Sequence, residues 1–174
     1  MTTSPRFKGS NSLPGARPLL KWAGGKTQIL PAIESRLPRG LADGTITQYV
    51  EPFARSAAVF FFVSQRFPLE ECHLYDINEE LVLVYRVVQR DVAGLIERAA
   101  ALADGYAAAP ETEREALFYR VRERFNRERA AIDFDAYGDD WAERAAQFLF
   151  LNKTCYNDIF RVNSRGAFNA PFGR

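Results

Sequence analysis

The chain has 174 residues, of which 47% are hydrophobic and 26% are charged, so it can form one soluble globular domain with a substantial core. Its formal net charge is +1, which excludes a protein-wide basic field for nucleic acid and leaves only a local basic surface for that purpose. Cys72 and Cys155 lie too far apart to indicate a disulfide framework or a zinc site, and the longest apolar stretch, 57–63, is too short to span a membrane.

Residues 1–17 are rich in Ser, Pro, Gly and Asn and show no apolar period, so we expect a flexible tail. The tail carries basic residues but no apolar core, and it therefore does not match a secretory signal. We expect a cytoplasmic protein with free thiols.

Helix and strand signals alternate over residues 18–90. The expected elements, in chain order, are a helix over 27–37, a strand over 46–52, a helix over 57–67, a strand over 71–77 and a helix over 79–89. Pro31 falls in the first turn of its helix, where proline is tolerated, and Asn78 can cap the last helix through its side-chain oxygen. The helix over 57–67 is apolar nearly all round and should be buried. This rhythm predicts a right-handed parallel unit, half of a doubly wound α/β sheet.

The pattern changes after Asp91, where a helical segment begins. Three helices are expected, from 91 to about 104–105, over 113–128 and over 141–151. Thr112 and Glu115 fit a capping box for the second of them. Asp139 or Asp140 can cap the third.

The helix over 113–128 carries one apolar stripe beneath a surface rich in Arg and Glu, because Leu117, Val121 and Phe125 recur at four-residue spacing. From Cys155 onward, aromatic and β-branched residues are punctuated by Asn-Asp and Arg-Gly, which predicts a hairpin. The fold class expected from the whole chain is α/β, with a partial Rossmann-like sheet followed by an α-helical insert and a β-hairpin.

Three motifs follow one another in the first half of the chain. Residues 19–26 read Leu-Leu-Lys-Trp-Ala-Gly-Gly-Lys, residues 49–53 read Tyr-Val-Glu-Pro-Phe, and residues 74–78 read Leu-Tyr-Asp-Ile-Asn. They outline a nucleotide-type pocket made of a lysine-bearing loop, a strand-to-helix turn and a carboxylate for a ribose. In this order, and with the blocks 148–157 and 160–174, the chain resembles the Dam-like (D12-class) adenine-specific DNA methyltransferases.

The resemblance implies a methyltransferase of the restriction-modification type that transfers a methyl group from S-adenosyl-L-methionine to the exocyclic amine of adenine in double-stranded DNA. It assigns residues 18–90 to cofactor binding and residues 91–174 to recognition of the DNA target. The cofactor contacts that it implies are Trp22, Lys26, Glu51, Phe53 and Asp76. The DNA contacts that it implies are Lys153, Tyr156, Asn157, Arg161, Asn163 and Arg165.

The residues themselves leave alternatives open. Lys26 does not belong to a P-loop, because that motif needs a glycine where Leu20 stands. Lys26 is either a solvated lysine in a glycine turn or a partner for a cofactor carboxylate. The Trp22 indole can cover one face of an adenine ring. Asp76 can accept hydrogen bonds from ribose hydroxyls, or cap the helix that follows it, or do both.

The turn after Phe53 departs from the pattern of the family, which usually has glycines near 55 and 57. Arg55 stands there, and a positive φ at this residue would cost about 1–2 kcal/mol. Its side chain either projects into the pocket or points to solvent while the turn adapts. Asp158 likewise stands where the family frequently has glycine.

The segment that contains the predicted DNA contacts interleaves basic and amide side chains with aromatic ones. Such a mixture suits phosphate contacts and wedging beside a displaced base. A charged surface hairpin with a small aromatic core is the structural alternative.

No residue is assigned a catalytic role or a metal. The family holds the flipped adenine with (Asp/Asn)-Pro-Pro-Tyr, and none of the nine prolines of this chain follows Asp or Asn. We therefore expect the N-terminal part of such an enzyme, truncated before the catalytic motif and inactive alone. It is either one half of a split enzyme whose second polypeptide supplies the missing strands, or a non-catalytic cofactor- or DNA-binding remnant.

Overall fold

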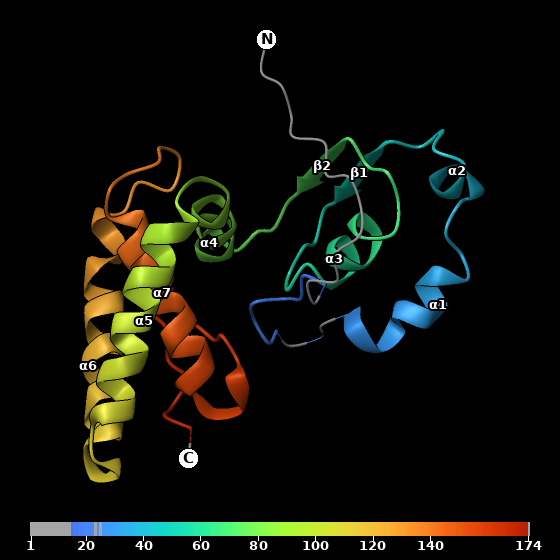
Figure 1. Cartoon of the computed structure of the whole chain (residues 1–174). Coiled ribbons are helices and arrows are strands. Elements are labelled where there is room, and N and C mark those ends of the chain that lie inside the picture. The colour runs from blue at the N-terminus through green and yellow to red at the C-terminus, as the bar shows by residue number, and fades with distance from the viewer. Residues whose placement is uncertain (1–14, 23, 25, 174) are drawn as a thin grey trace.

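The computed structural model describes residues 15–22, 24 and 26–173 (Figure 1). Most of the predicted tail, together with Ala23, Gly25 and Arg174, lies outside the described residues. A small α/β part near the N-terminus is followed by a larger helical part. No helix in the described ranges is long and apolar enough to cross a membrane.

Two short parallel strands, β1 (Gln48–Glu51) and β2 (Glu71–Leu74), form the only sheet among the described residues. Gln48 pairs with Glu71 and Glu51 pairs with Leu74, and α3 (Ala58–Ser64) connects the strands, so the predicted parallel β-α-β unit is confirmed. Both strands are shorter than expected, and α3 ends three residues early. The fold is a mixture of helices and strands compatible with an α/β methyltransferase.

The segment before β1 differs from the single helix predicted over 27–37. It forms a 3₁₀ turn, η1 (Lys26–Ile29), then α1 (Leu30–Glu34), and a further short helix, α2 (Arg39–Ala42), that the sequence did not indicate. These pieces pack on α3 through a small cluster around Leu41, Val59 and Val63. The central phenylalanines of α3 are only half-buried, so this helix is not buried all round as predicted.

The helical part begins with α4 (Glu79–Arg90) and α5 (Val92–Ala108). The Asn78 cap fits the prediction, because its Oδ1 atom accepts from the Leu81 N–H (3.2 Å). Asp91, where a new helical segment was expected to begin, caps α5 by accepting at Oδ1 from the Gly94 N–H (2.9 Å). Although the sequence groups α4 with the α/β part, its apolar side chains lie in the core of the helical part.

The remaining helices are α6 (Glu111–Glu128), a 3₁₀ turn η2 (Arg129–Ala131), α7 (Trp141–Thr154) and a 3₁₀ turn η3 (Tyr156–Asp158). The predicted Thr112 capping box is wrong, because α6 already begins at Glu111, after Pro110, and no side chain caps it. Asp140 does occupy the N-cap position of α7, but its side chain makes no capping hydrogen bond.

The core of the helical part is centred on α7, which lies beside α5 and α6 (Figure 1). The largest buried side chains on it are Trp141, Arg144 and Phe148. Leu20, from the loop before η1, is 3% exposed and belongs to the same core. The loop with the Lys-Trp motif is therefore packed against the helical part.

A buried ionic cluster joins α4 to α7. The Arg144 guanidinium, 2% exposed as a residue, donates from Nε to Glu80 Oε2 (2.9 Å) and from Nη2 to Glu80 Oε1 (2.5 Å). Its Nη1 atom donates to the Phe125 carbonyl, and Arg129 Nη1 donates to Glu80 Oε1 (2.9 Å). Helices α4, α6 and α7 thus meet at one charged junction inside the core.

The end of the described chain folds back on itself without forming paired strands. Two isolated antiparallel bridges join Cys155 to Phe172 and Val162 to Phe168. The N–H of Asn163 donates to the Ala167 carbonyl (2.9 Å), closing a turn around 163–167. A tight antiparallel turn therefore stands where the hairpin was expected, and the hairpin itself is not confirmed.

Candidate cofactor and DNA site

Lys26 is tied to the end of β1. Its Nζ atom donates to Glu51 Oε1 (2.5 Å) and to the Phe53 carbonyl (2.7 Å). Glu51 is 4% exposed, and its Oε2 atom accepts from the Tyr49 hydroxyl (2.9 Å) and from the Phe60 N–H (3.2 Å). Burial and the Glu51 charge raise the pKa of Tyr49, which keeps its hydroxyl protonated as a donor. Lys26 is therefore not a solvated lysine.

Asp76 joins the turn after β1 to the turn after β2. Its Oδ2 atom accepts from the Arg55 N–H (2.9 Å), and its Oδ1 atom accepts from the Asn78 N–H (3.0 Å). Each carboxylate oxygen has a second lone-pair direction, so these bonds leave capacity for two hydroxyl donors. The structural role of Asp76 and the predicted contact with a ribose are compatible.

The turn at 54–57 contains two residues in the left-handed region, Arg55 (φ 51°) and Ala57 (φ 54°). These are the positions where the resembled family has glycine, so the predicted backbone strain at Arg55 is present. Arg55 Nη1 donates to the Gly24 carbonyl (3.2 Å), and the Arg55 carbonyl accepts from the Tyr85 hydroxyl (2.7 Å). The arginine side chain thus bonds to the Lys-Trp loop and does not simply point to solvent.

Trp22 stacks on aromatic side chains of the helical part. Its ring lies 5.6 Å from Phe160 and 6.2 Å from Phe148, with interplanar angles of 13° and 19°. It also borders a cavity of about 580 Å³ between the Lys-Trp loop and the turn at 54–57, where Leu20, Thr27 and Ser56 are further lining residues.

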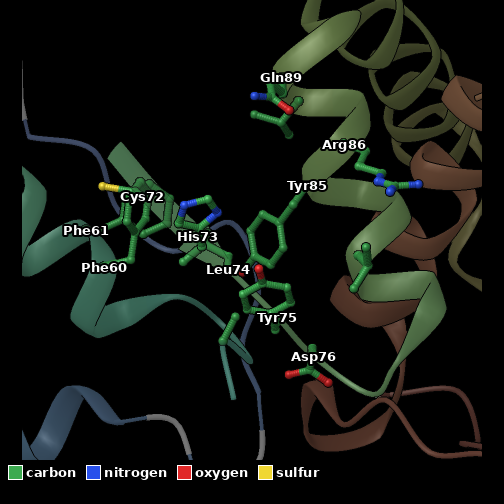
Figure 2. Close-up of a pocket in the computed structure, with 13 residues that line it drawn as sticks. Phe60, Phe61, Cys72, His73, Leu74, Tyr75, Asp76, Tyr85, Arg86 and Gln89 are labelled. Atoms are coloured by element: carbon green, nitrogen blue, oxygen red, sulfur yellow. The ribbon is translucent and has the colours of Figure 1, made fainter. Parts of the chain in front are cut away.

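A second cavity, of about 600 Å³, lies along β2 between α3 and α4. Figure 2 shows Phe60 and Phe61 on one side, Tyr85 and Gln89 on the other, and Asp76 at one end. Trp22 and Asp76 therefore border different cavities, and Lys26 borders neither. The three side chains therefore do not line one cleft. Lys26 and Asp76 belong to a hydrogen-bonded assembly at the carboxyl ends of the two strands, whereas Trp22 stacks on the helical part.

Two apolar side chains at these carboxyl ends are unusually exposed. Phe53 is 68% exposed and Ile77 is 97% exposed, and they follow β1 and β2 respectively. Phe53 is among the cofactor contacts that the resemblance implies, whereas Ile77 is not. Ile77 lies between Asp76 and the capping residue Asn78.

The predicted DNA contacts are all exposed and come from the last turn of α7 and the segment after it: Lys153, Tyr156, Asn157, Arg161, Asn163 and Arg165. Arg161 donates to the side chain and to the backbone carbonyl of Asn169 (2.9 and 3.1 Å). The Asn163 Oδ1 atom accepts from the N–H groups of Arg165 and Ala167, so this oxygen closes the turn. Asn157 and Asp158 adopt positive φ.

Comparisons with known proteins agree with the motifs. The family model of D12 class N6 adenine-specific DNA methyltransferase matches residues 22–174. The type II methyltransferase M.MjaIII of Methanocaldococcus jannaschii is 46% identical over 158 residues, which are 91% of this chain and 52% of that protein. The DNA adenine methylase of Escherichia coli K12 is 35% identical over 158 residues, 91% of this chain and 48% of that protein. This chain spans about half the length of the curated relatives that it matches.

Proposed function

Because the chain belongs to the D12 class of N6 adenine-specific DNA methyltransferases, we propose that it binds S-adenosyl-L-methionine and double-stranded DNA for transfer of a methyl group to the exocyclic amine of adenine. The observation that carries this proposal is the assembly of Lys26, Glu51, Arg55 and Asp76 at the carboxyl ends of β1 and β2. Open α/β sheets bind their ligands at that edge. We also propose that the β1–α3–β2 unit is the start of a Rossmann-like sheet.

The donor set at this edge fits the chemical groups of the cofactor. Asp76 offers acceptors for a ribose diol, and the exposed Phe53 and Ile77 offer apolar surface for a purine ring. Lys26 and Glu51 place one cation and one anion side by side, which suits the carboxylate and amino groups of the methionine end. The bound cofactor supplies an electrophilic methyl group on a sulfonium.

The test of cofactor binding replaces Asp76 by asparagine. The isosteric change removes the charge that strengthens hydrogen bonds from the ribose, so we expect the Kd for S-adenosylhomocysteine to rise about tenfold or more, measured by calorimetry. Asp43→Asn is the matched control, because Asp43 also accepts a backbone N–H in a turn (Thr45, 3.0 Å) but lies outside the site. Equal affinity of native protein and Asp76→Asn contradicts the assignment.

We propose that the segment after α7 contacts DNA, chiefly through phosphates. Its exposed basic and amide groups suit backbone contacts, and the exposed ring of Tyr156 (58%) suits stacking beside a displaced base. Among the described residues, the Arg165 side chain has no hydrogen-bond or ion-pair partner and only its backbone N–H donates, to Asn163, whereas the Arg161 side chain donates to Asn169. Arg165 is therefore the residue best placed for a phosphate.

Replacing Arg165 by alanine should weaken DNA binding about equally for all sequences. Loss of one phosphate contact should reduce the slope of log K against log salt by about 0.9. The measurement is fluorescence anisotropy of a labelled duplex over a salt series. Arg36→Ala, on the surface near α1, should leave the slope unchanged. An unchanged slope for Arg165→Ala would remove this residue from the interface.

A second candidate function is binding without turnover. It is favoured by the absence of any Asp-Pro or Asn-Pro dipeptide in the chain, because the family holds the flipped adenine through such a motif. We propose that methyl transfer requires strands supplied by a further segment or a second polypeptide, and that the 174 residues alone bind the ligands without transferring the methyl group.

A further inference from the structure

Asn152, in the last turn of α7, bridges two segments that are distant in sequence. It is 0% exposed, and its Nδ2 atom donates to the Lys21 carbonyl (3.1 Å) and to the Asp158 carbonyl (3.0 Å). Both neighbours are carbonyl oxygens, which can only accept, so the amide must present its NH₂ group to them. One buried side chain thereby joins the Trp22 loop (residues 18–22) to the segment that contains the predicted DNA contacts (residues 156–165, the recognition segment).

Two other contacts lie at the same junction. The Trp22 ring stacks on Phe160, and Lys21 Nζ forms an ion pair with Asp158 Oδ2 (2.6 Å). The Lys21 side chain is 72% exposed, and an exposed ion pair adds little to stability because solvent screens it. The hydrogen bonds of Asn152 are shielded from water, so they are the stronger polar interaction between the Trp22 loop and the recognition segment.

The Asn152 amide lowers the stability of the fold in one respect, which indicates that its N–H donors have a specific role. Its Oδ1 atom is buried and has no hydrogen-bond partner among the described residues. An unpaired buried oxygen destabilises the fold, and a leucine of similar volume would avoid that cost. What leucine lacks is the pair of N–H donors that hold the two carbonyl groups together.

We propose that Asn152 is a positioning residue, which holds the Trp22 loop against the recognition segment and couples cofactor binding to DNA binding. The coupling rests on the function proposed above and on Trp22 as one of the cofactor contacts that the family resemblance implies, whereas the positioning stands on the hydrogen bonds alone. DNA that orders the recognition segment should raise the affinity of the protein for the cofactor. Because linkage is reciprocal, the cofactor should raise the affinity for DNA by the same factor.

The test measures hydrogen exchange of the full chain by mass spectrometry. In Asn152→Leu, peptides that cover residues 18–22 should exchange about tenfold faster than in the native protein, while global stability is equal or higher. Asn126→Ala is the matched control, because the Asn126 side chain also makes two hydrogen bonds to one distant backbone, at Phe168. That variant should speed exchange around Phe168 and leave residues 18–22 unchanged.

Asp158→Gly distinguishes the effect of the buried Asn152 hydrogen bonds from that of the exposed ion pair between Lys21 and Asp158. Glycine keeps the carbonyl that Asn152 binds and relieves the positive φ (52°), but it removes the ion pair with Lys21. Exchange at residues 18–22 should change less than about twofold, because an exposed ion pair is weak. If Asp158→Gly loosens the loop as much as Asn152→Leu does, or if Asn152→Leu leaves the loop unchanged, the proposal is overturned.

Calorimetry with S-adenosylhomocysteine, with and without a DNA duplex, tests the coupling. The duplex should lower the Kd in the native protein, and this effect should be lost in Asn152→Leu. Equal effects of the duplex in both proteins contradict the coupling. If the native protein binds neither ligand, the proposed function fails, and the exchange experiment still decides the positioning role.

Discussion

Replacing Arg144 by alanine should lower the free energy of unfolding by about 3–5 kcal/mol, because the change breaks a buried ion pair and leaves the buried Glu80 carboxylate without its main partner. Glu80 would keep only the partly exposed Arg129 as its cationic partner, and the Phe125 carbonyl would lose the guanidinium donor. The cavity left inside the core adds to this cost, since Arg144 is among the largest fully buried side chains. Urea-induced unfolding followed by circular dichroism gives the measurement.

Arg124→Ala is the matched control for this prediction. Arg124 pairs with Glu128 and Glu143 on the surface of the same helical part, and its side chain is 50% exposed. Its removal should cost less than about 1 kcal/mol. The double variant Glu80→Leu, Arg144→Met should recover much of the loss, because it removes both buried charges and refills the volume. If Arg144→Ala costs no more than Arg124→Ala, the cluster does not stabilise the core.

Local features of the sequence predicted the local structure well. The predicted Asn78 cap depends on an oxygen and an N–H three residues apart, so both partners of the interaction lie in one short stretch of sequence. The Thr112 capping box failed for an equally local reason. Pro110 already has a backbone conformation that precedes a helix, and acidic residues in the first turn stabilise the start at Glu111.

Individual contacts between residues that are distant in sequence could not be predicted from the sequence. The motifs correctly indicated that the Lys-Trp loop, the turn after β1 and Asp76 gather at one edge, because parallel strands bring their carboxyl ends together. Nothing in the sequence showed that Lys26 pairs with Glu51, or that Trp22 stacks on Phe160 at the far end of the chain. A periodicity identifies a buried face but not the partner that covers it.

The isolated chain should self-associate, and a fragment that carries additional strands should suppress this. Tyr75 N–H donates to the Glu51 carbonyl (2.9 Å). In a parallel pair, every second residue of a strand directs its backbone N–H and C=O away from the partner strand. These residues are Cys72 and Leu74 on β2 and Val50 on β1. Both edges of the sheet are therefore open in the described part of the chain. An open edge is a template for pairing with another strand.

Apolar surface adds to the tendency to associate. Val50 is 58% exposed and Tyr75 is 57% exposed, and apolar side chains of α3, β2 and α4 line much of the cavity along β2 (Figure 2). A strand that paired with β2 would complete the backbone hydrogen bonds of its open edge. Such a strand would also extend the parallel sheet, which is normally covered on both faces.

The experiment compares the chain alone with the chain co-expressed with the part of the Methanocaldococcus jannaschii relative that it does not match. Alone, the chain should form concentration-dependent oligomers in light scattering and melt broadly. With the fragment, it should become a defined complex with a cooperative melt, and transfer of tritiated methyl groups to DNA should appear only in that complex. A monodisperse, sharply melting monomer that ignores the fragment would show that the two-stranded sheet needs no further strand. Methyl transfer by the chain alone, with host methyltransferases excluded, would show that the reaction needs no further strand either.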